Sequence, residues 1–159
     1  MVRGLSVLLI IVISVIAFPL SANDHHAGYY YPNPVTKEAY RSRTRTLSEA
    51  SREARAAFVI SITNNMIRKN SYPPQFAVYS KGSRQQKLII VGLRDDAYNT
   101  LFRARALLTQ LKAVVLTTRI MPTKMKTNDL TFLDLLKSIG FEQLIVSDGK
   151  EFSHQINIR

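Results

Sequence analysis

The chain has 159 residues, 46% of them hydrophobic, with 22 Lys and Arg against 11 Asp and Glu and no Cys. This composition excludes a disordered chain, a collagen-like repeat, a disulfide-stapled scaffold and thiol chemistry. The length allows one small domain with a single core, and the net charge of +11 indicates attraction to anionic partners.

The first 22 residues follow the three-part pattern of a secretory signal peptide. Arg3 supplies a positive charge, an apolar run of 14 residues covers 5–18, and Pro19 precedes the small residue Ala22. Because a membrane span needs about 20 apolar residues, we expect cleavage after Ala22 and a soluble periplasmic protein. The alternative is that residues 1–22 stay as an inner-membrane anchor, with the domain facing the periplasm.

Residues 23–35 are polar, aromatic and rich in proline, without a helical or strand period, which predicts an extended arm before a single domain at 36–159. Tyr29, Tyr30 and Tyr31 stand together in this arm. We take them as candidate contacts for a partner, and the alternative is that they pack against the domain.

Cleavage after Ala22 would expose a candidate metal site. Asn23, Asp24 and His25 would then offer a free amine, two backbone amides and an imidazole, which can form a square plane around Cu(II) or Ni(II). His26 adds a second imidazole. Cu(II) is therefore the candidate cofactor, and the alternative is a pair of solvated histidines.

Alternation over residues 36–46 predicts the first strand of the domain, with Arg41, Arg43 and Arg45 on one side. Three arginines on one strand face would form a contact for anions. The alternative is an ordinary solvated strand face.

The next helix is predicted to begin at Ser48 and to end before Pro73. Two β-rich runs at 75–80 and 87–93 then predict an antiparallel hairpin. The apolar positions of the helix recur at spacings of three and four residues: Ala50, Ala54, Ala57, Phe58, Ile62 and Met66.

A second helix is predicted after Asp95 or Asp96, either of which can cap it. A short third helix is predicted from Thr131, with Asp134 as its capping-box partner and Gly140 as its end. The apolar stripe of the second helix is continuous: Leu101, Ala104, Leu108, Leu111 and Val115, beside Tyr98 and Phe102.

Residues 141–159 predict two strands around a tight turn at Asp148 and Gly149. Counting by twos places one set of side chains on a common face: Ile145, Phe152, His154, Ile156 and Ile158. The elements together predict an α+β domain, with a four- to five-stranded, largely antiparallel sheet and about three helices.

His154 and Asp148 are the candidate residues of a pocket. With Ser147 or Ser153 nearby, they suggest an envelope hydrolase, but no nucleophile elbow precedes them, and Asp148 is explained by its turn. A hydrogen-bonded core histidine is the preferred interpretation, and we assign no catalytic residue. The sequence also has no zinc-helix, EF-hand, phosphate-loop or dinucleotide-loop spacing.

Four segments resemble a family of small exported proteobacterial proteins of uncharacterised function, whose members are often labelled molybdopterin-guanine dinucleotide biosynthesis proteins. They are HHAGYYYP at 25–32, KLIIVGL at 87–93, NTLFRARALLTQL at 99–111 and TFLDLLKSIGFEQLIVSDGKEFSHQ at 131–155. The resemblance implies a single periplasmic domain. The label would imply a cytosolic nucleotidyltransferase with a glycine-rich nucleotide loop, and no such loop occurs here, so the resemblance supplies no catalytic residue.

These observations predict a basic, non-enzymatic periplasmic accessory or binding protein. Its expected partners are an envelope protein or an anionic envelope surface, and no nucleic-acid module signature is present. An envelope enzyme with a cleft around His154, and an anchored subunit of an envelope complex, are the alternatives.

Overall fold

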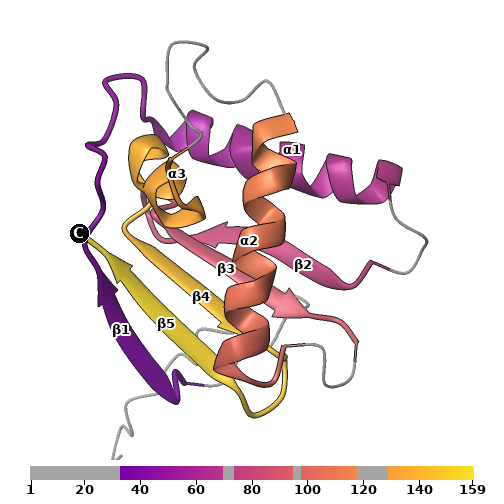
Figure 1. Cartoon of the computed structure of the whole chain (residues 1–159). Coiled ribbons are helices and arrows are strands. Elements are labelled where there is room, and N and C mark those ends of the chain that lie inside the picture. The colour runs from indigo at the N-terminus through magenta and orange to yellow at the C-terminus, as the bar shows by residue number, and fades with distance from the viewer. Residues whose placement is uncertain (1–32, 70–73, 95–97, 118–128) are drawn as a thin grey trace, which may run out of the picture.

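The computed structural model describes residues 33–69, 74–94, 98–117 and 129–159. Five strands and three helices occupy these ranges (Figure 1). They are β1 (Thr36–Tyr40), α1 (Arg52–Lys69), β2 (Phe76–Lys81), β3 (Lys87–Gly92), α2 (Leu101–Thr117), α3 (Phe132–Ile139), β4 (Gln143–Ser147) and β5 (Ser153–Ile158). The predicted signal segment at 1–22 and the predicted caps Asp95 and Asp96 lie outside the described residues.

The five strands form one sheet in the order β1-β5-β4-β3-β2, so the predicted α+β class is confirmed. The sheet is mixed instead of largely antiparallel. The β2–β3 and β4–β5 pairs are antiparallel, whereas β1–β5 and β3–β4 are parallel. The parallel β3–β4 pair requires a crossover, which α2 and α3 provide.

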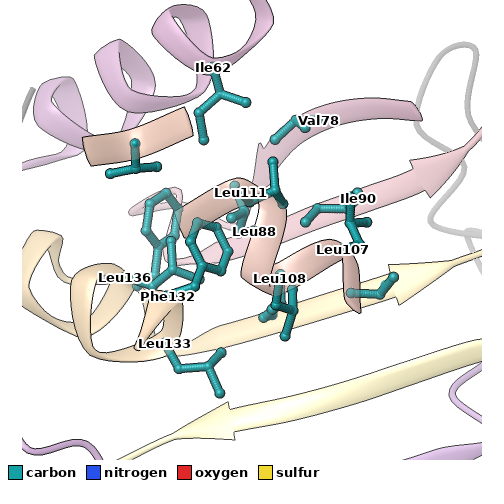
Figure 2. Close-up of a cluster of buried hydrophobic side chains, with 14 of the residues drawn as sticks. Ile62, Val78, Leu88, Ile90, Leu107, Leu108, Leu111, Phe132, Leu133 and Leu136 are labelled. Carbon is teal, nitrogen blue, oxygen red and sulfur yellow. The ribbon is translucent and has the colours of Figure 1, made fainter. Parts of the chain in front are cut away.

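All three helices lie on one face of the sheet and cover the main core there (Figure 1). Figure 2 shows how side chains from the helices and strands meet in this core. Its members include Ile62, Val78, Leu88, Ile90, Leu107, Leu108, Leu111, Phe132, Leu133 and Leu136. No helix in the described ranges is long and apolar enough to cross a membrane.

A smaller buried cluster of Ile89, Val91 and Ile145 lies on the opposite face of the sheet. The prediction that Ile145 shares a face with His154 is therefore wrong. In the β4–β5 register, His154 pairs with Val146, and Ile145 pairs with Gln155. A two-residue turn at Asp148 and Gly149 would pair Ile145 with Phe152, but residues 148–152 form a five-residue loop, which pairs Ile145 with Gln155 and so places it on the other face.

Helix α3 begins and ends at the residues that the sequence predicts, with Thr131 as its N-cap and Gly140 as its C-cap. Thr131 Oγ1 accepts a hydrogen bond from the backbone N–H of Asp134, and the Asp134 side chain accepts one from the backbone N–H of Thr131. Gly140 ends the helix with φ 91°, in the left-handed region. The buried guanidinium of Arg55 on α1 donates to the carbonyls of Ile139 and Gly140, which fixes α1 against the end of α3.

Helix α1 begins later than predicted, at Arg52, because Ser51 Oγ accepts a hydrogen bond from the Ala54 N–H and caps it. Its predicted apolar stripe divides into two parts. Phe58, Ile62 and Met66 are buried in the core, whereas the alanines near its start lie at the surface beside α3.

Candidate anion-binding site

The predicted first strand ends early, and Asp134 provides the physical reason. β1 stops at Tyr40, and the next residues turn toward α3 instead of continuing along the sheet. The Asp134 carboxylate accepts hydrogen bonds from the Arg43 N–H at 2.8 Å and from Ser42 Oγ at 3.0 Å. Thr44 Oγ1 donates to the Asp134 carbonyl at 2.8 Å. These bonds hold the segment after β1 against α3.

The Asp134 carboxyl is 0% exposed and remains ionised in the fold. Burial by itself would raise its pKa, but hydrogen bonds from the backbones of Thr131 and Arg43 and from the hydroxyls of Thr131 and Ser42 outweigh burial and lower the pKa to about 2. A buried carboxylate with this many donors holds the segment after β1 in one conformation.

The predicted row of three arginines is not formed, because Arg43 faces Asp134. Its Nη2 lies 3.3 Å from Asp134 Oδ2 and also donates to the Asp129 carbonyl. Arg43 therefore neutralises the buried carboxylate. Arg41 and Arg45, two residues away on either side, line a cavity of about 570 Å³.

Two further cations line the same cavity, Lys137 from α3 and Arg159 beyond β5. Within the described part of the chain, no Asp or Glu side chain lines this cavity, and none of its four cations has an ion-pair partner. Ser42, Thr44 and Thr46 also line it. We call this the basic cavity.

Backbone pairing positions Arg159 in the basic cavity. The Arg159 N–H donates to the Tyr40 carbonyl at 2.9 Å, and the Ser42 N–H donates to the Arg159 carbonyl at 2.8 Å. Figure 1 shows this end of the chain beside the segment that follows β1. Sequence reasoning missed Lys137 and Arg159, because neither lies near the arginine row in the chain and no local pattern joins them to it.

An apolar groove of about 320 Å³ adjoins the basic cavity. At the boundary between the groove and the basic cavity, the Leu47 N–H donates a hydrogen bond of 3.0 Å to the Ser138 carbonyl. The groove is lined by Leu47, Glu49, Ala50, Ala54, Ala57, Ser138 and Ile139. We call this the alanine groove.

His154 is a buried, hydrogen-bonded histidine, 2% exposed, on the helix face of β5. Its Nδ1 shares a hydrogen bond of 2.7 Å with Thr36 Oγ1, and its Nε2 lies 3.3 Å from Glu38 Oε1. Arg105 Nη2 lies 2.7 Å from Glu38 Oε2. Burial would raise the pKa of the Glu38 carboxyl, but hydrogen bonds from His154 and Arg105 outweigh it and hold the pKa below its ordinary value.

The other residues of the predicted His154 pocket lie elsewhere. Asp148 Oδ1 accepts hydrogen bonds from the N–H groups of Lys150 and Phe152, as a turn residue does. Ser147 and Ser153 pair with each other in the sheet register and lie on the face opposite His154. Among the described residues, no hydrogen bond or ion pair joins Asp148 to His154.

The candidate copper ligands Asn23, Asp24, His25 and His26 lie outside the described residues, as do Tyr29, Tyr30 and Tyr31. In the described ranges, no group of three or more His, Cys, Asp or Glu side chains is placed to hold a metal ion. Comparison of the chain with models of protein families, with curated proteins and with solved structures found no match.

Proposed function

We propose that this protein is an exported, non-enzymatic binding protein that holds an anionic group of an envelope partner in the basic cavity. The N-terminal pattern supports export. The single observation that carries the binding role is a cavity lined by four cationic side chains, Arg41, Arg45, Lys137 and Arg159, with no Asp or Glu side chain among its described lining residues.

The ion pair between Arg43 and Asp134 supports this proposal. The fold places a buried carboxylate against Arg43, two residues from Arg41 and from Arg45, yet no ion pair within the described ranges involves either of these two neighbours. Four cations around one hollow repel one another, and a bound phosphate or carboxylate relieves that repulsion. Arginine suits this role, because its planar fork donates two parallel hydrogen bonds to such an anion.

The geometry favours binding over the envelope-enzyme alternative. A catalytic histidine must reach its substrate, whereas His154 is buried between Thr36 and Glu38. The anchored alternative differs only in the fate of residues 1–22, because the basic cavity would face the periplasm in both cases.

Calorimetric titration with inorganic pyrophosphate tests the proposal, using the protein isolated from the envelope of the expressing host. We expect saturable binding at 0.15 M salt, and the double variant R41Q/R45Q should bind at least about tenfold more weakly, as expected for the loss of two charge-assisted hydrogen bonds.

The matched control is R52Q/R94Q, which removes the same charge at exposed positions outside the cavity. Charges more than about 8 Å from the anion are largely screened at this salt concentration, so the control should change the affinity by less than about twofold. Equal losses in the two double variants would overturn the proposal, because binding would then depend on net charge alone.

A further inference from the structure

The alanine groove narrows the class of anion. Resting on the proposed function, we propose that the ligand is an anionic amphiphile, a phosphate or carboxylate head on a single acyl chain. The head lies in the basic cavity, and the first part of the chain lies in the alanine groove.

The two hollows are lined by neighbouring residues of two separate elements. In the segment after β1, Thr46 lines the basic cavity and Leu47 lines the groove. On α3, Lys137 lines the cavity and Ser138 lines the groove. The hydrogen bond from Leu47 N–H to the Ser138 carbonyl holds this boundary together. The two hollows therefore adjoin at this boundary, and a chain attached to a head in the basic cavity can extend across it into the groove.

The residues that line the groove suit an acyl chain. Ala50, Ala54 and Ala57 give it small side chains that leave room above the start of α1, and Leu47 and Ile139 supply apolar walls. The nearby Arg55 guanidinium is occupied by the carbonyls of helix and loop residues. It therefore offers no free cation to bind a second anionic head.

The charges of the two hollows determine which end of the ligand lies in each. Glu49 is the only carboxylate that lines the groove in the described structure, and it is exposed. Its charge repels an anionic head from the groove, while the four cations of the basic cavity attract that head. This complementarity favours a ligand with one charged end over a neutral lipid or a polar peptide.

Calorimetry with a set of soluble probes tests the inference. The probes are n-octyl phosphate below its micelle concentration, n-butyl phosphate, and n-octyl glucoside with its neutral head. Each methylene that is fully buried contributes about a factor of four to affinity. The groove is open on one side, so we expect n-octyl phosphate to bind at least about tenfold more tightly than n-butyl phosphate, and n-octyl glucoside to bind more weakly than n-octyl phosphate.

The variant Ala57→Phe fills the groove from an exposed position of α1, so the core is not disturbed. It should reduce the affinity for n-octyl phosphate to about that for n-butyl phosphate and leave n-butyl phosphate binding unchanged. The matched control is Ala106→Phe at an exposed position of α2, which should change neither affinity.

The outcomes separate this inference from the proposed function. If n-octyl phosphate binds no better than n-butyl phosphate while both depend on Arg41 and Arg45, the amphiphile inference fails and the anion site stands. If R41Q/R45Q binds both n-octyl phosphate and pyrophosphate as tightly as the natural protein does, both the amphiphile inference and the proposed function fail. If A57F only changes a concentration-dependent dimer in sedimentation, the groove is an interface between two copies, and the amphiphile inference is overturned.

Discussion

Asp134 accepts hydrogen bonds from both the backbone and the side chain of Arg43, with its Oδ1 2.8 Å from the Arg43 N and its Oδ2 3.3 Å from Arg43 Nη2. One residue thus supplies both the anchor of the segment after β1 and the neutralising charge. The alternate residues Arg41 and Arg45 remain as walls of the basic cavity. The segment that lines the basic cavity is therefore held by a carboxylate that does not itself line the cavity.

Replacing Asp134 should loosen the whole segment. Asp134→Asn removes the buried charge that Arg43, Ser42 and Thr131 satisfy, and we expect the free energy of unfolding to fall by about 3 kcal/mol. Urea denaturation measures this change. The control Asp129→Asn, at an exposed position, should cost less than about 0.5 kcal/mol. Equal effects of the two substitutions would contradict the anchoring role.

Stability should fall in acid in a way that depends on Asp134. Its folded-state pKa of about 2 lies below the ordinary value of 3.8, so its contribution is complete above about pH 4 and disappears as the pH falls toward 2. The difference between these pKa values corresponds to about 2 kcal/mol. Urea midpoints measured from pH 5 to pH 2 should show this loss in the natural protein. A variant D134N with the same acid dependence would show that another group is responsible.

Arg43 and Arg45 should behave oppositely when each is changed to Gln. Arg43→Gln removes a partner of Asp134, so it should lower the free energy of unfolding by about 1–2 kcal/mol and change pyrophosphate affinity by less than about threefold. Arg45→Gln should leave stability within about 0.5 kcal/mol and weaken binding by about fivefold or more. Thermal unfolding and calorimetry on the same samples measure both quantities. A larger loss of binding in the Arg43 variant would reverse the assignment.

His154→Ala should act on stability alone. It removes a buried ring and leaves Thr36 and Glu38 without that partner, so we expect a loss of about 2–3 kcal/mol. Pyrophosphate binding should be unchanged, because His154 pairs with the Thr36 end of β1, whereas the basic cavity adjoins its Tyr40 end. Thr36→Val is the milder control and should cost about 1 kcal/mol. A specific loss of ligand binding in the His154 variant, beyond its loss of stability, would support the envelope-enzyme alternative.

The intact mass of the protein from its host envelope decides the export model. We expect a chain that begins at Asn23 and binds one equivalent of Cu(II) through its free amine and His25, detected by the visible absorption of a square-planar complex. His25→Ala should abolish that absorption, whereas His26→Ala should retain it. A mass that includes Met1 would support the anchored form and remove the amine on which this copper site depends.

Local signals in the sequence predicted several elements correctly, because the interactions that form them join residues close in the chain. The capping box of Thr131 and Asp134 and the left-handed end at Gly140 are complete within ten residues. The β2–β3 hairpin likewise follows from two apolar runs on either side of a loop that contains Gly82. Phe102, predicted to lie beside the apolar stripe of α2, is 83% exposed, because packing against the sheet selects only one side of the helix.

The sequence by itself therefore determined the α+β class, most of the helix and strand positions and the excess of positive charge, all of which depend on composition and on spacing along the chain. Only the tertiary structure decided the parallel β1–β5 and β3–β4 pairs, the end of β1 at Tyr40 and the gathering of Lys137 and Arg159 beside Arg41 and Arg45. These features depend on contacts between distant residues. The Asp134 carboxylate, 91 positions from Arg43, redirects a segment whose own alternation would continue as a strand.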